Sequence, residues 1–327
     1  MPVFKAKEYI YQAVQGVLSQ TYTNLELIII DDNNDDGCYV RINEINDKRI
    51  RYYKGKKQGL AGARNYGVEL SKGTYIANMD ADDVYNNQRI EKQINYLLEN
   101  KIQICGTWMS YFGNYNNRFL KNPIKDIDIK FCMLFSSPIA NPTVLGLADL
   151  FKSNLYINSV AEDYDLWARL AIQGVKFGNI PEVLTGYRIH NDQTSNTKYS
   201  KMISDSIKVA DFYSLNYNDD VSHEVLKKYN YIFNEKYNIE EINDLAKILI
   251  EIGVKNNISQ DAILNALCNC FIKLDKPGFK SLMIYYKYLN KCNISIFKKK
   301  NINILMQSIF SLKRGTFLFN ALKKIAF

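Results

Sequence analysis

Residues 25–32 read LELIIIDD, and residues 74–83 read TYIANMDADD. Each stretch is a short apolar run that ends abruptly in aspartates. Runs of this kind are typical of strands that are buried on both faces of a parallel sheet. Because ligands of such sheets bind beyond the carboxyl ends of the strands, the two acidic clusters predict a site at one edge of the sheet.

Helical patterns alternate with these strands along the first 100 residues. Ile10, Val14 and Val17, for example, fall on one face of a helix. Such alternation predicts an α/β fold in which a mostly parallel sheet is flanked by helices. The predicted elements are helices over 7–19, 37–47, 59–71 and 86–99 and strands over 25–30, 50–53 and 74–79.

The pattern changes twice further along the chain. Residues 100–200 are less regular, with a helix predicted over 161–173 and strands after Asn141-Pro142 and over 183–190. We therefore predict a first domain over 1–200 and a helical, basic extension over 201–327. The extension holds helices over 203–217, 240–256, 259–274 (with Ser259 as N-cap) and 278–292 and an amphipathic tail over 301–327.

The positive charge of the chain is concentrated at its end. Lys and Arg number 42 against 34 Asp and Glu, a net charge of +8, and residues 273–327 contribute +11 (12 − 1) of it. Basic residues among Ile, Leu and Phe predict peripheral contact with an anionic membrane. A packed helical domain or a homodimer contact is the alternative, and nucleic acid is not expected because no binding motif accompanies the charge.

Cysteine usage and hydropathy exclude other classes of protein. Six scattered cysteines and two histidines offer no clustered ligands for zinc, and free thiols are typical of the cytosol. The chain opens without the apolar region of a signal peptide, and no stretch reaches the ~20 apolar residues of a membrane span. We expect a cytoplasmic protein, attached at most peripherally to the inner face of the cytoplasmic membrane.

Three groups of residues could carry chemistry. Asp80, Asp82 and Asp83 repel one another unless a cation lies among them, and Mg²⁺ or Mn²⁺ with a diphosphate suits such a cluster. A solvated loop is the alternative. Glu162-Asp163 either cap a helix or supply a general base. His190 either packs at a strand end or touches a metal or phosphate.

In combination these residues resemble the family-2 glycosyltransferases, which have the GT-A fold. The resemblance covers about residues 2–200. It implies inverting transfer of a sugar from a nucleotide-diphosphate donor, a UDP-sugar, to a glycan or lipid-linked acceptor, with Mg²⁺ or Mn²⁺ as cofactor. The role implied is synthesis of a bacterial surface polysaccharide, lipooligosaccharide, lipopolysaccharide or capsule. The matching stretches are 18–32, 59–65, 73–83, 141–143, 161–170 and 187–190 with Ser195.

The same resemblance implies a role for individual residues. Asp163 is the catalytic base that deprotonates the acceptor hydroxyl. The residues implied to bind the nucleotide sugar are Pro2, Asp32, Arg64, Asn65 and Asp80. Those implied to bind the metal are Asp82, Asp83 and His190. Those on the acceptor side, or in support, are Glu162, Trp167 and Arg188.

The chain also departs from the family pattern. It begins at the turn Pro2-Val3-Phe4, so we expect the first strand to be missing. Either the true start lies upstream, or the protein is a weak or inactive relative that binds a nucleotide sugar or acts as a scaffold. A sugar-phosphate nucleotidyltransferase is less favoured, because no Gly-rich basic loop is present. At residues 145–147 and 154–157 the sequence differs from the family pattern on the acceptor side, so the identity of the acceptor is left open.

Overall fold

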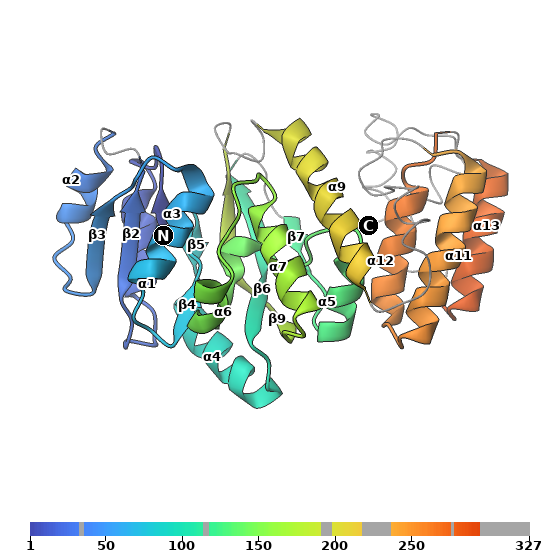
Figure 1. The fold of residues 1–327 in the computed structure, drawn as a ribbon, viewed down its shortest axis with the longest axis horizontal. Helices are drawn as coiled ribbons and strands as arrows, with labels where there is room; N and C mark the ends of the chain where they lie inside the picture. The colour runs from blue at the N-terminus through green and yellow to red at the C-terminus, as the bar shows by residue number, and fades with distance from the viewer. Residues whose placement is uncertain (33–35, 114–117, 191–197, 218–236, 276–277, 295–327) are drawn as a thin grey trace. The chain divides into compact units, whose positions relative to one another are not determined.

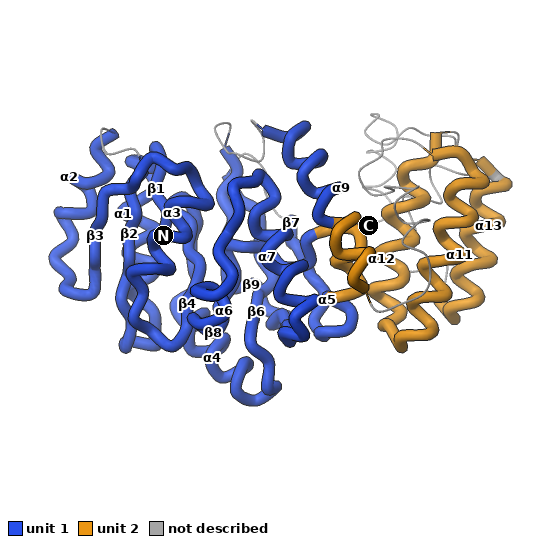
Figure 2. Tube along the Cα trace, in the orientation of Figure 1, with its two compact units in different colours: residues 1–129, 137–209 blue, residues 130–136, 210–327 orange. Residues whose placement is uncertain are grey.

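The computed structural model describes residues 1–32, 36–113, 118–190, 198–217, 237–275 and 278–294 (Figure 1). The chain divides into two compact units (Figure 2). Unit 1 contains Met1–Ile129 and Ser137–Val209, and unit 2 contains Lys130–Ser136 and Ala210–Phe327. The domain boundary that we placed at residue 200 stays a prediction.

The first sheet of unit 1 is parallel, with the order β1–β2–β3. Its central strand β2 (Leu27–Asp31) pairs with β1 (Pro2–Val3) on one side and β3 (Ile50–Lys54) on the other. All five residues of β2 are buried, as the apolar run predicts. The helices that accompany this sheet are α1 (Ile10–Leu18), α2 (Cys38–Asn43) and α3 (Gly59–Leu70).

The two faces of β2 pack in different cores. Leu27 and Ile29 lie in one core with residues of α1 and α2, whereas Ile28 and Ile30 pack in another with Ala63 of α3. Successive side chains of a strand point to opposite faces, so a strand covered by helices on both faces needs an unbroken apolar run. This double burial fixes the position of Asp31 and Asp32 at the strand end.

The second sheet of unit 1 is mixed, with the order β4–β8–β6–β9–β5 and with β7 paired to β6. Its two long strands, β6 and β9, are parallel, and the other pairs are antiparallel. The strands are β4 (Tyr75–Ala77), β5 (Val84–Tyr85), β6 (Ile104–Gly113), β7 (Arg118–Leu120), β8 (Leu145–Leu147) and β9 (Phe177–Ile189).

Helices account for most of the remaining described chain. The sequence predicted most of them but not α5 or α6. Two helix starts in unit 2 carry side-chain caps: Asn238 forms a capping box with Glu241, and Ser259 accepts from the backbone N–H of Ala262, as predicted. The helices are α4 (Arg89–Asn100), α5 (Asp126–Cys132), α6 (Ala148–Ser153), α7 (Glu162–Ile172), α9 (Tyr199–Asn216), α11 (Ile239–Lys255), α12 (Gln260–Phe271), α13 (Phe279–Lys291) and a 3-10 turn (Asn141–Thr143).

The predicted amphipathic tail over 301–327 lies outside the described residues. Among the residues that the structure does describe, no helix combines the length and the apolar character that crossing a membrane requires.

A two-residue strand stands where we expected the first strand to be missing. β1 pairs with the end of β2, and the Met1 amino group donates to the Ile28 carbonyl at 2.9 Å. The backbone N–H of Ile30 donates to the Met1 carbonyl at 3.0 Å. These bonds give the Ile28 carbonyl and the Ile30 N–H of β2 their partners. Burial lowers the pKa of the Met1 amino group to about 5.

A cavity of about 550 Å³ lies between the first sheet and β4. In the antiparallel pair, the backbone N–H and C=O groups of Ile76 point toward β8. Those of its neighbours Tyr75 and Ala77 therefore point the other way, toward the cavity. Met1 and Pro2 line the same cavity. Apolar residues that filled this cavity would be removed from water, at a gain of about 25 cal/mol per Å² of apolar surface buried.

An engineered N-terminal extension that fills this cavity should therefore stabilise unit 1. At about 3.3 Å per residue, about five alternating Val and Ile residues before Met1 would continue β1 along β2. We expect a higher Tm by scanning calorimetry than for the chain as it stands. An extension of the same length made of Gly and Ser is the control. Equal Tm values for the two extended chains would contradict the expectation.

Candidate active site

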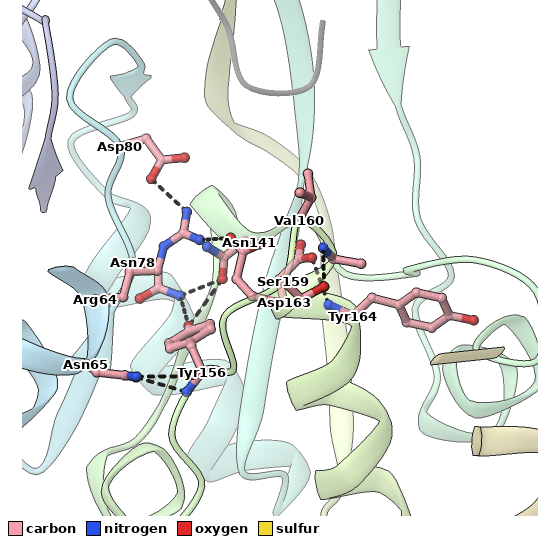
Figure 3. Close-up of polar contacts among 12 residues, drawn as sticks. Arg64, Asn65, Asn78, Asp80, Asn141, Tyr156, Ser159, Val160, Asp163 and Tyr164 are labelled. Atoms are coloured by element: carbon pink, nitrogen blue, oxygen red, sulfur yellow. Dashed lines mark hydrogen bonds and ion pairs between the residues drawn. The ribbon is translucent and has the colours of Figure 1, made fainter. Parts of the chain in front are cut away.

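Arg64 of α3 lies at the centre of the candidate site (Figure 3). Its Nη1 pairs with Glu162 at the start of α7, and its Nη2 lies 3.3 Å from Oδ1 of Asp80. The guanidinium carbon lies 5.6 Å from the centre of the Tyr156 ring. Arg64 is only 9% exposed. It therefore joins the end of β4 to the first turn of α7 through buried ion pairs.

Amide side chains complete the surroundings of Arg64. With its oxygen turned toward Arg64, the Asn141 amide lies 2.8 Å from Nη2. Asn78 Nδ2 donates to the Tyr156 hydroxyl at 2.8 Å. Asn65 bonds the backbone of Tyr156 in both directions, donating to its carbonyl at 2.8 Å and accepting from its N–H at 2.9 Å. These contacts attach the loop before α7 to α3.

The acids at the start of α7 are buried against this cluster. Burial raises the pKa of Glu162 and of Asp163, and the positive charge of Arg64 opposes that rise in both. Asp163 Oδ1 accepts a hydrogen bond from the backbone N–H of Tyr164 at 2.7 Å. Burial thus makes both carboxylates stronger bases than carboxylates in water, a property that suits a general base.

Asp82 and His190 form a second group. His190 Nε2 lies 2.9 Å from Asp82 Oδ2, and the His190 ring packs against Tyr9 with 5.4 Å between ring centroids. A carboxylate and an imidazole suit Mn²⁺, which leaves its remaining positions for phosphate oxygens. Among the residues described, no three His, Cys, Asp or Glu side chains gather as a metal site. The pair therefore fits a cation whose remaining coordination positions are filled by the phosphate oxygens of the donor.

Asp83, which was also predicted as a metal ligand, directly follows Asp82 in the chain. Asp83 is 1% exposed, and its Oδ1 accepts from the backbone N–H of Arg188 at 3.0 Å. Its Oδ2 has no hydrogen-bond partner among the described residues. Burial, together with the neighbouring carboxylates of Asp80 and Asp82, raises the pKa of Asp83 well above its usual range. Asp83 thereby holds the backbone at Arg188, and its role as a metal ligand stays a prediction.

Arg188 and Trp167 also have supporting positions. Arg188 Nε donates to the Asp82 carbonyl at 2.8 Å, and its guanidinium carbon lies 4.5 Å from the centres of both the Tyr9 and Phe112 rings. It holds the loop that carries Asp82. Trp167 is fully buried and packs edge-on against Phe151. It thereby anchors α7 in the core.

The two other residues predicted to bind nucleotide lie at the first sheet. The carboxylate of Asp32 accepts from the backbone N–H groups of Lys57 at 2.7 Å and Gly59 at 3.0 Å. It thereby holds the loop that leads into α3. A Cβ at Gly55 would lie 2.3 Å from Asp32 Oδ1, so this position requires glycine. Pro2 lines the 550 Å³ cavity, whose wall also includes Arg64 and Asp80.

Several residues of the site were not found from the sequence. Asn141 stood in a matching motif without an assigned role. Tyr156, an aromatic residue in a loop, gave no signal. Neither did Tyr85, whose hydroxyl accepts from the backbone N–H of Asp80 at 2.6 Å and donates to its carbonyl at 2.9 Å. Ser195, part of the last matching motif, lies outside the described residues.

Comparison with known proteins identifies the family. The sequence profile described as Glycosyl transferase family 2 matches residues 1–147. A glycosyltransferase of Haemophilus influenzae, described as uncharacterized, is 31% identical, and the alignment covers 92% of this chain and 96% of that protein. The chain belongs to glycosyltransferase family 2. Another relative, the UDP-Glc:alpha-D-GlcNAc-diphosphoundecaprenol beta-1,3-glucosyltransferase WfaP of Escherichia coli, is 34% identical over 62% of this chain and 81% of its own length.

A solved structure shows that this glycosyltransferase shares the fold of known enzymes. The crystal structure of S. aureus TarS 1–349 in complex with UDP-GlcNAc superposes with a TM-score of 0.54 at 12% identity. It covers 94% of this chain and 90% of that one. At so low an identity the likeness concerns the fold alone. The predicted GT-A fold, with its helical C-terminal part, is thereby confirmed.

Substitution of Arg64 should move the pH dependence of this glycosyltransferase. Because its charge lowers the pKa of Glu162 and of Asp163, R64Q raises both pKa values. A base that must be ionised then loses its activity at a higher pH. We expect the acidic limb of kcat/KM to shift to higher pH in R64Q and less in R64K.

The matched control is R51Q, because Arg51 pairs with Glu26 outside this cluster. An acidic limb that stays in place in R64Q, or that moves equally in R51Q, would show that Arg64 does not set the charge of these acids.

Proposed function

We propose that this glycosyltransferase transfers a sugar from a UDP-sugar to a hydroxyl group of a glycan or lipid-linked acceptor, with inversion at the anomeric carbon. The observation that carries the proposal is the convergence of two acidic groups from separate parts of the chain. Asp80 and Asp82 follow β4, and Glu162 and Asp163 begin α7. Arg64 bridges Asp80 and Glu162.

In this proposal Asp163 is the general base. The acceptor oxygen forms a bond to the anomeric carbon while its proton passes to the Asp163 carboxylate. The bond from the anomeric carbon to the diphosphate breaks, and UDP leaves with the electron pair. Attack opposite the leaving group inverts the configuration. Glu162 holds Arg64 and thereby keeps a positive charge beside Asp163.

Asp82 and His190 would hold the divalent cation, Mg²⁺ or Mn²⁺, that family resemblance implies. When bound, such a cation neutralises the charge that develops on the departing diphosphate. Asp82 and His190 already lie within hydrogen-bond distance of each other. Arg188 fixes the Asp82 backbone, so the carboxylate is oriented before the donor arrives.

The acceptor that we propose is a lipid-linked or surface glycan of a bacterium. The name of the related E. coli enzyme WfaP gives a UDP-glucose donor and a diphosphoundecaprenol-linked acceptor for that protein. The positive charge of residues 273–327 supports an acceptor at an anionic membrane surface. A nucleotide-sugar binding or scaffold protein without activity is the alternative that the sequence leaves open.

The variants D163N and D82N test the division of roles. D163N should lower the transfer rate by about 10²- to 10⁴-fold, the usual contribution of a general base. Its Kd for UDP in the presence of Mn²⁺ should stay unchanged, because Asp163 acts on the acceptor. D82N should lose the Mn²⁺-dependent part of UDP binding. Both constants are measured by calorimetry, and transfer by product formation.

Two outcomes would contradict this division. If D163N weakens UDP binding as much as D82N does, the assigned roles are wrong. If the wild-type chain binds UDP with Mn²⁺ but neither hydrolyses nor transfers any nucleotide sugar tested, the protein is the binding relative and not the enzyme.

Flotation with vesicles tests the membrane contact. We expect the full chain to float with anionic phosphatidylglycerol vesicles and not with neutral phosphatidylcholine vesicles, because basic side chains gain about 1 kcal/mol each near anionic lipid. The matched variant replaces the seven basic residues between positions 298 and 324 by Gln and should stay in solution. If the full chain also stays in solution, the membrane contact is disproved. The residues replaced are Lys298, Lys299, Lys300, Lys313, Arg314, Lys323 and Lys324.

A further inference from the structure

Asp205 of α9 reaches the loop that leads into the first turn of α7. Its Oδ2 accepts a hydrogen bond from Ser159 Oγ at 3.0 Å and another from the backbone N–H of Val160 at 3.2 Å. Ser159 Oγ in turn accepts from the backbone N–H of Ala161 at 3.0 Å. Figure 3 shows Ser159 and Val160 immediately beside Asp163. Two consecutive backbone N–H groups are therefore held, directly or through Ser159, by one carboxylate.

The start of α7 depends on these contacts because its own N-cap residue provides none. The N-cap is Ala161, which has no side-chain oxygen and forms no side-chain cap. Helix starts leave N–H groups without partners inside the helix, and Ser, Thr, Asp or Asn usually bonds one of them. Here Asp205 and Ser159 instead fix the turn that precedes the helix. Glu162 and Asp163 follow Ala161 directly.

The charge of Asp205 strengthens this arrangement. Burial alone would raise the pKa of Asp205, but the hydrogen bonds from Val160 and Ser159 outweigh burial, and the pKa is lowered. Asp205 is thus ionised at neutral pH. Hydrogen bonds to an ionised acceptor are stronger than those between neutral groups. Lys208 adds an ion pair with Asp205 at 3.5 Å, but its side chain is 75% exposed, so it contributes little.

We propose that Asp205 is a positioning residue for Asp163, acting through Ser159 and the backbone of Val160 and Ala161. The proposal rests on the role of Asp163 as general base in the proposed function. Asp205 touches neither donor nor acceptor in this account. It fixes the direction in which the first turn of α7 presents the Asp163 carboxylate, from a helix that follows β9 in the chain.

Substitution of Asp205 should lower the transfer rate without weakening the binding of the donor. Because a misplacement of ~1 Å can cost up to ~10²-fold in rate, we expect D205A to lower kcat by about 10- to 100-fold. The Kd for UDP with Mn²⁺ should stay within about twofold of that of the wild-type protein, since the donor side is untouched. D205N, which keeps one acceptor oxygen, should retain an intermediate rate.

Two matched variants separate this role from a general loss of stability. K208Q removes the exposed ion pair but keeps the hydrogen bonds, so its rate should equal that of the wild-type protein. S159A removes one link of the relay, and the effects of S159A and D205A on kcat should not add in the double variant. Thermal unfolding of every variant shows whether the protein is folded at the assay temperature.

The deciding experiment combines D205A with D163N in one variant. If Asp205 acts through Asp163, D205A should have no further effect on the residual rate of D163N. A further loss in D163N, a loss of UDP affinity that matches the loss of kcat, or a wild-type rate in D205A would each overturn the proposal. Full transfer activity in D163N alone would overturn the proposed function itself, so the two failures are distinguishable.

Discussion

The buried guanidinium of Arg64 is the interaction on which the site depends. A charge taken out of water must be paired, and removing one partner of a buried pair typically costs about 3–5 kcal/mol. Arg64 finds its partners in Asp80 and Glu162, which lie 82 positions apart (162 − 80). The folded chain can therefore satisfy Arg64 only by bringing the end of β4 and the start of α7 together. The residues that assemble the site are the same ones that balance its charge.

Different contacts fix the two groups of acids at the site. Arg188 packs against Tyr9 and Phe112 and bonds the Asp82 carbonyl. Asn65 holds the loop before α7 at Tyr156. The positions of Asp82 and of the first turn of α7 therefore depend on different residues. Arg64 connects the end of β4 with the start of α7.

The sequence predicted the parts of this arrangement that follow from local pattern. The apolar run of β2 and the acids at its end followed from burial on both faces and from parallel pairing with β1 and β3. For β4 the prediction of a doubly buried parallel strand was wrong, because its three residues are half-buried and it pairs antiparallel with β8 in the second sheet. β6 was not predicted from the sequence, because Gly106 and Thr107 interrupt its apolar residues, although both are tightly packed. The orientation of Asp83 could not be predicted, because neighbouring carboxylates in a loop differ only in the partners that the fold supplies. Tyr156 and Asn78 act through contacts distant in sequence, which no local pattern records.

The most direct test of the account is a crystal structure of the protein with UDP and Mn²⁺, with the metal located by its anomalous scattering. We expect one manganese peak at Asp82 and His190, beside the diphosphate of UDP. A manganese ion held by neither Asp82 nor His190, or a diphosphate bound directly by the guanidinium of Arg64 with its ion pairs broken, would contradict the account.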